Sequence, residues 1–117
     1  MNGGSNPVKA KRIKQADHTV VIPADITQTD DIVWMNHGQH VTFEHGASFS
    51  LEFVVESPDE QGGLVFKSDP PQGGKHRRKL KLKTVGKMTA CKYTIVVGGT
   101  RHDPIIIIDP NAPSNEN

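Results

Sequence analysis

Short stretches in which apolar and polar residues alternate recur along the chain, and no helical period persists beyond one turn. In residues 48–56, phenylalanine, leucine and valine alternate with serine and glutamate, and in residues 79–83 two leucines alternate with three lysines. Such alternation is typical of a strand that buries one face. Clusters of Gly, Pro and Asn separate the stretches and mark turns. The pattern therefore predicts an all-β protein.

The last part of the chain predicts a closing β-hairpin, because β-branched runs at residues 90–97 and 105–108 flank a loop of turn-forming residues. With the earlier strands, this hairpin favours an antiparallel Greek-key β-sandwich. The predicted strands cover residues 18–22, 32–35, 39–44, 48–56, 64–66, 79–83, 90–97 and 105–108. The predicted core consists of Val21, Trp34, Val41, Phe43, Leu51, Phe53, Leu80, Leu82, Tyr93, Ile95, Val97, Ile106 and Ile108.

A chain of 117 residues has room for one domain. Residues 1–15 are rich in Gly, Asn and Lys/Arg and lack an apolar period, so we expect a disordered basic N-terminal tail. Residues 111–117 are polar and are expected to form a disordered C-terminal tail. The sandwich is then expected to span residues 16–110.

The run Trp34-Met35-Asn36, followed by His40-Val41-Thr42-Phe43 and by the closing hairpin, resembles the cupredoxin family, the blue-copper β-sandwich. Asp103-Pro104 before a β-branched run is similar to a feature of small bacterial cupredoxin-like proteins without copper ligands. The resemblance covers roughly residues 17–110. It implies a cupredoxin-like fold. In that family, the loop between the final two strands carries a cysteine ligand, and here that loop contains none.

A type 1 copper site needs two imidazoles, a thiolate and a weak axial thioether. The resemblance assigns the two histidine positions to His40 and His102. Cys91, however, stands at the start of the penultimate strand, and at ~3.3 Å per residue it is expected roughly 20 Å from the loop. We therefore expect no type 1 copper centre and no cofactor, with Cys91 as a small, partly buried apolar residue.

A different metal site stays open as an alternative. His37 and His40 are close together at a strand start, and His102 could join them to bind copper, zinc or nickel. A copper-binding or electron-transfer protein would use these three imidazoles. Two histidines in a turn are a signal of low specificity, so loop histidines without a metal are favoured.

The basic run at residues 75–83 gives a second alternative, a binder of polyanions or nucleic acid. On a strand, alternate lysines project to one side ~6.6 Å apart, close to phosphate spacing. No aromatic residue lies among them to stack on bases. Lysines also protect an edge strand from intermolecular pairing, and this interpretation is favoured over nucleic acid. The candidate cations are Lys75, Arg77, Arg78, Lys79, Lys81 and Lys83.

The net charge of +1 hides a segregation of charges along the chain. Residues 15–66 contain nine acids and no Lys or Arg, whereas residues 67–117 contain ten basic residues and four acids. These two parts either neutralise each other within the fold or form opposite faces that promote association with a protein partner or a second copy. Internal neutralisation is favoured.

Several sequence features are absent, and their absence narrows the functions to be expected. A single cysteine excludes an internal disulfide, and no apolar segment follows the N-terminal basic residues as in a signal peptide. We expect a cytoplasmic protein, or a periplasmic one if the N-terminus was trimmed, with no membrane span. No paired carboxylates, nucleophile motif or phosphate loop indicates an enzyme. The sequence therefore predicts a non-catalytic binding or assembly module.

Overall fold

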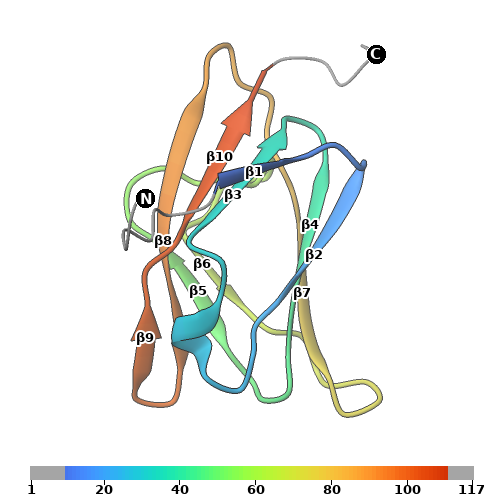
Figure 1. Cartoon of the computed structure of the whole chain (residues 1–117), viewed down its shortest axis with the longest axis vertical. Coiled ribbons are helices and arrows are strands. Elements are labelled where there is room, and N and C mark those ends of the chain that lie inside the picture. The colour runs from blue at the N-terminus through green and yellow to red at the C-terminus, as the bar shows by residue number, and fades with distance from the viewer. Residues whose placement is uncertain (1–9, 111–117) are drawn as a thin grey trace, which may run out of the picture.

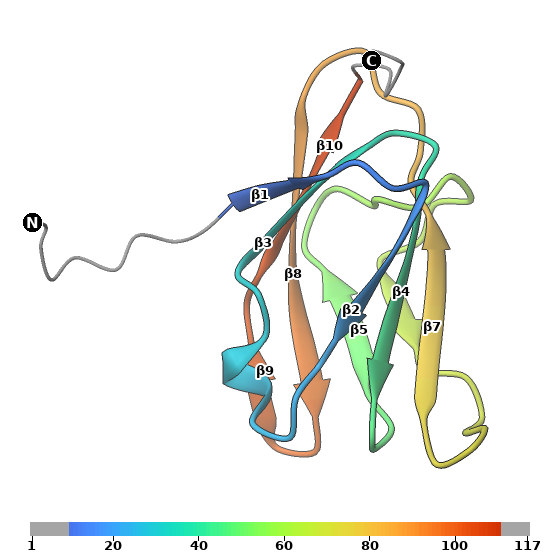
Figure 2. The same cartoon turned by 45° about the vertical axis from the view of Figure 1, so that its right-hand side comes forward.

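A computed structural model describes residues 10–110 and shows two β-sheets packed against each other in a sandwich-like arrangement (Figures 1 and 2). In spatial order, the larger, seven-stranded sheet contains β1 (Ala10–Ile13), β3 (Ile32–Asn36), β10 (Ile105–Asp109), β8 (Thr89–Val97), β5 (Ser50–Phe53) and β6 (Val65–Lys67), with β9 (Thr100–His102) paired to β8. The smaller sheet contains β2 (Asp17–Val21), β4 (His40–His45) and β7 (His76–Lys81). A short 3-10 helix, η1 (Ile26–Gln28), links β2 to β3. Within residues 10–110, no helix has the length and apolar character that crossing a membrane requires.

The pairing of the strands is mixed. The prediction of an all-β, sandwich-like fold is confirmed, but the prediction of purely antiparallel sheets is wrong. β1 and β3, β3 and β10, and β2 and β4 each pair in parallel. The alternation of a strand reports which face is buried and does not report the direction of its neighbour. Strands that follow each other in sequence, such as β2 and β3, enter different sheets instead of forming a hairpin.

The N-terminal boundary of the sandwich lies earlier than expected. Residues 10–13, within the predicted tail of residues 1–15, form β1 at the edge of the larger sheet. Their backbone pairs with residues 32–35 of β3, so main-chain hydrogen bonding orders a segment that has no apolar period. Residues 1–9 and the predicted tail at 111–117 lie outside the described residues.

The core between the sheets is apolar and includes most of the residues that the alternation predicts. Two predictions are wrong: Val21 is 62% exposed, and Trp34 is only partly buried. In both strands the buried positions are shifted by one residue, so Val20, Val33 and Met35 fill the core instead. Such a shift moves every side chain of a strand to the other face. Val97 is partly buried and packs against the core. The predicted core residues found buried are Val41, Phe43, Leu51, Phe53, Leu80, Leu82, Tyr93, Ile95, Ile106 and Ile108.

The predicted closing hairpin is present with an added strand. β8 pairs antiparallel with β10, as expected, but its end first turns back into β9. The turn uses Gly98, whose φ of +57° is in the left-handed region that glycine adopts without strain. β9 places His102 opposite Ile95 of β8. The loop between the two predicted strands is therefore a small hairpin in its own right.

Candidate functional site

The three candidate histidines do not lie together. His37 is in the turn after β3, and His40 is the first residue of β4. His102 is on β9, which leads into β10. Because β3 and β10 run parallel, β10 begins at the end of the sandwich where β3 begins, and His37 follows the opposite end (Figure 1). The length of β3, five residues at ~3.3 Å, separates the two ends by roughly 16 Å.

Two of these imidazoles form hydrogen bonds with the backbone of the protein. The Nδ1 atom of His37 accepts a hydrogen bond of 3.2 Å from the backbone N–H of Val85. The Nε2 atom of His102 donates to the carbonyl oxygen of Thr29 at 3.1 Å. One ring nitrogen of His37 and one of His102 are therefore already engaged in a hydrogen bond. Among residues 10–110, no group of three or more His, Cys, Asp or Glu side chains is placed to hold a metal ion.

Cys91 lies in the core, as expected of a small apolar residue, and is 0% exposed. Burial raises the pKa of its thiol to about 11, which disfavours the thiolate that a copper ion requires. It is the third residue of β8, and His102 pairs with a residue four positions further along that strand. At ~3.3 Å per residue, the backbone positions of Cys91 and of the residue paired with His102 are therefore roughly 13 Å apart along the strand. The residues present do not fit a type 1 copper site.

Most cations of the basic run form ion pairs with acidic side chains of the same chain. Arg77 Nε lies 2.7 Å from Glu44 Oε2, and Lys75 Nζ lies 3.7 Å from Oε1 of the same carboxylate. Three further ion pairs join Arg78 to Asp69, Lys81 to Glu60 and Lys83 to Glu56. The acids Glu44, Glu56 and Glu60 belong to the acidic part of the chain, so the segregated charges meet within the fold. Lys79 is exposed, and the described part of the chain provides no ion-pair partner for it.

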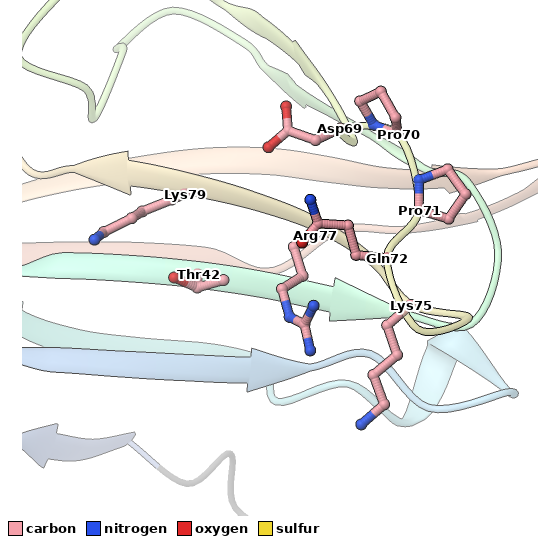
Figure 3. Close-up of a pocket in the computed structure, with 8 residues that line it drawn as sticks. All are labelled: Thr42, Asp69, Pro70, Pro71, Gln72, Lys75, Arg77 and Lys79. Carbon is pink, nitrogen blue, oxygen red and sulfur yellow. The ribbon is translucent and has the colours of Figure 1, made fainter.

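An open hollow of about 440 Å³ lies beside the basic run, on the smaller sheet (Figure 3). Figure 3 shows the ammonium group of Lys79 pointing away from Lys75 and Arg77, so the three cations do not converge on one point. The hollow can attract an anion but does not enclose one. Its lining consists of Thr42, Asp69, Pro70, Pro71, Gln72, Lys75, Arg77 and Lys79.

The outer face of the larger sheet carries an apolar surface that our sequence analysis missed. Ile32 and Trp34 of β3 lie directly beside Ile105 and Ile107 of β10, and all four side chains are partly exposed. We call these four residues the isoleucine–tryptophan patch. The sequence signal was present in the four consecutive isoleucines of residues 105–108, because alternate residues of a strand face opposite sides.

Trp34 is held in place by polar contacts at the edge of this patch. Its indole Nε1 donates a hydrogen bond of 2.9 Å to Oδ2 of Asp109, whose side chain is 1% exposed. Arg12 of the neighbouring strand lies 3.5 Å from the same carboxylate oxygen and 6.0 Å from the centre of the indole ring. Arg12 also donates to the side-chain oxygen of Asn36.

Comparison with known proteins identifies no relative. No protein-family model matches the chain, and no match is found among curated proteins.

Proposed function

We propose that this chain is a non-catalytic module for binding or assembly, with a cupredoxin-like Greek-key fold and without a type 1 copper centre. The observation that carries the proposal is the position of Cys91. A buried thiol with a raised pKa, inside a core of apolar side chains, is a poor copper ligand and a poor nucleophile. The two sheets and the pairing of β8 with β10 support the cupredoxin resemblance. The partly exposed isoleucine–tryptophan patch supports a binding role.

Copper titration tests this proposal directly. Cu(II) is added to the purified protein while visible absorption and histidine NMR signals are followed. We expect no thiolate-to-copper absorption band, and we expect Cys91→Ala to respond to copper as the natural protein does. A blue sample whose colour is lost in Cys91→Ala would overturn the proposal.

The same titration addresses the alternative metal site. The structure separates His37 and His40 from His102, which disfavours one site built from all three. Single His→Gln variants at these positions are compared. If all three variants lose the same specific binding, the imidazoles share a site and the alternative replaces our proposal.

Binding of a polyanion is a second candidate, favoured by Lys79. This exposed lysine lacks an ion-pair partner within residues 10–110 and lies at the hollow of Figure 3. The protection of the edge strand β7 from intermolecular pairing explains the same run of lysines equally well. Loops contribute to this protection, since they cover both ends of β7. The carbonyl of Arg77 accepts from the N–H of Asp69 at 2.7 Å, and that of Lys81 accepts from Glu60 at 2.9 Å.

Affinity for a labelled oligonucleotide over a series of salt concentrations separates these two explanations. Polyanion binding predicts salt-sensitive affinity that falls in Lys79→Glu and is retained in Lys67→Glu, which makes the same charge change at an exposed position of β6. Absence of binding at low salt, or equal loss in both variants, rejects Lys79 as a binding residue.

A further inference from the structure

We propose that β2 binds an extended peptide, which adds a fourth strand to the smaller sheet and places alternate side chains in a groove between the two sheets. The expected partner is a segment of another protein that presents apolar side chains and a lysine or arginine on one face. This inference rests on the proposed binding or assembly function and names the kind of partner.

The outer edge of β2 carries backbone groups that are free to pair. β2 is the last strand of the smaller sheet, and its neighbour is β4. The N–H of Ile22, directly after β2, donates to the carbonyl of Glu44 in β4 at 2.8 Å. Successive residues of a strand direct their backbone groups to opposite edges. Within residues 10–110, the groups that point away from β4 have no hydrogen-bond partner, and they belong to Asp17, Thr19 and Val21.

The devices that protect an edge strand are present elsewhere in the protein and are missing from β2. The edge strand β7 carries lysines, and loops form hydrogen bonds with its carbonyls at both ends. On β6, the guanidinium of Arg78 donates to the carbonyl of Lys67 at 3.2 Å. β2 contains no lysine, arginine or proline. An open edge without such protection is a template for an added strand.

A groove of about 440 Å³ opens beside this edge, between β2 of the smaller sheet and β1 and β3 of the larger sheet. Ile13, Ile32 and Val33 supply apolar atoms to its lining. His18 also lines it, so the face of β2 that carries His18 and Val20 is turned toward the groove. Successive side chains of a strand point to opposite faces. Every second side chain of the added peptide therefore enters the groove.

The charges of the groove select a basic side chain. The carboxylate of Asp30 lies in the lining, is exposed and has no ion-pair partner within residues 10–110. The guanidinium of Arg12, also in the lining, is engaged by Asp109 and Asn36. Burial lowers the pKa of His18 below 6.5, so its imidazole is largely uncharged at neutral pH. A lysine or arginine of the peptide can pair with Asp30, whereas an acidic residue in its place is repelled.

A synthetic peptide tests the proposal in the full chain. The probe is the capped heptapeptide Thr-Val-Thr-Lys-Thr-Val-Thr, whose valines and lysine face the groove when its threonines point outward. NMR spectra are recorded during titration. We expect the amide signals of Thr19 and Val21 to shift and their hydrogen exchange to slow, because both N–H groups gain acceptors. The expected dissociation constant is in the micromolar to millimolar range.

Variants of the protein separate pairing at this edge from unspecific binding. Thr19→Pro removes a donor from the outer edge of β2 and should weaken binding by about tenfold or more. Val65→Pro makes a matched change at an exposed residue on the outer edge of β6 and should leave the affinity unchanged. Asp30→Asn, or a peptide with glutamate in place of its lysine, should weaken binding by about twofold to fivefold.

Circular dichroism first confirms that each variant is folded. Two N-methylated peptides give the same test on the natural protein if Thr19→Pro does not fold. Methyl groups on the threonine nitrogens block the edge that faces β2 in an antiparallel complex and should abolish binding. Methyl groups on the valine and lysine nitrogens block the opposite edge and should preserve it.

Three results would overturn the proposal: no binding at millimolar peptide, equal affinity of the two methylated peptides, or signal changes at Val65 and Lys67 of β6 in place of β2. These outcomes leave the copper-free proposal standing, because copper titration of the same samples tests that proposal separately.

Discussion

The indole of Trp34 and the carboxylate of Asp109 are joined by a hydrogen bond of 2.9 Å between strands that pair in parallel at the centre of the larger sheet. Asp109 is almost fully buried and is also paired with Arg12. Asp109→Asn keeps the shape of the side chain and removes its charge. We expect a loss of about 1–3 kcal/mol in the free energy of unfolding, because charge-assisted contacts are lost in a buried place. Urea unfolding followed by Trp34 fluorescence measures it.

Asp69→Asn is the matched control for that change. The carboxylate of Asp69 is 60% exposed and lies 3.8 Å from Arg78. Exposed ion pairs contribute little, so the expected change is within about 0.5 kcal/mol. Equal effects of the two substitutions on the free energy of unfolding would show that the contact between Asp109 and Trp34 contributes no more to stability than an exposed ion pair does.

Truncation of Val20 and of Val21 should lower the stability of the protein by unequal amounts. Val20 is 3% exposed and Val21 is 62% exposed. Val20→Ala should lower the free energy of unfolding by about 2 kcal/mol, because buried methyl groups are removed and a cavity remains. Val21→Ala should change it by less than about 0.5 kcal/mol. The reverse order in thermal or urea unfolding would mean that β2 faces the other way.

The hydroxyl of Tyr93 predicts a substitution that increases stability. The side chain is buried, its ring stacks on Phe53 with centroids 4.8 Å apart, and within residues 10–110 its hydroxyl has no hydrogen-bond partner. Tyr93→Phe removes an unsatisfied polar group and keeps the stacking, so we expect a gain of about 1 kcal/mol. Tyr93→Ala should instead cost about 3–5 kcal/mol. A clear loss of stability in Tyr93→Phe would reveal a partner for the hydroxyl.

The thiol of Cys91 should be chemically inert in the folded protein. Burial raises its pKa to about 11, so the reactive thiolate is scarce near neutral pH. A thiol-directed reagent should label the native protein very slowly and the urea-unfolded protein completely. Cys91→Ser should cost about 1–3 kcal/mol because it buries a hydroxyl, and Cys91→Ala should cost less. Rapid labelling of the folded protein would contradict the buried position.

His18 predicts part of the pH dependence of stability. Burial lowers the pKa of this imidazole below its usual value of 6.5, and the negative charge of Asp30 partly opposes the shift. The unfolded state therefore binds the proton more readily than the folded state does. The contribution of His18 is present above about pH 6.5 and decreases as the pH falls below it. Urea midpoints at about pH 8 and about pH 5 should differ less in His18→Gln than in the natural protein. An unchanged difference would exclude His18 as a source of acid sensitivity.

Local alternation was sufficient to locate most strands, as at Leu80 and Leu82, whose neighbours are exposed or partly exposed basic residues. It failed where several apolar residues follow one another. Val20 and Val21 are adjacent and chemically identical, so no periodic signal decides which one is buried. The direction of pairing and the edge position of β1 depend on contacts between distant residues, and no local pattern contains them.

The candidate site could likewise be predicted only where the signal is local in the sequence. The buried environment of Cys91 could be predicted from its place in a strand. The separation of His40 from His102 could not, because it depends on which ends of the strands meet. The network of Arg12, Trp34 and Asp109 joins three strands that are remote in the sequence, so its members carry no shared local signal.

The place of β10 has a consequence for how the protein is made in the cell. β10 lies between β3 and β8, and its neighbour β3 carries β1 on its other side. Until residues 105–109 have been translated, no strand connects β1 and β3 to β8 and the rest of the larger sheet. Before β10 is made, β1 and β3 can pair only with each other, so the edge of β3 that β10 later occupies stays open on the nascent polypeptide. Open strand edges favour aggregation, so the order of synthesis leaves this part of the sheet exposed until the last strand is added.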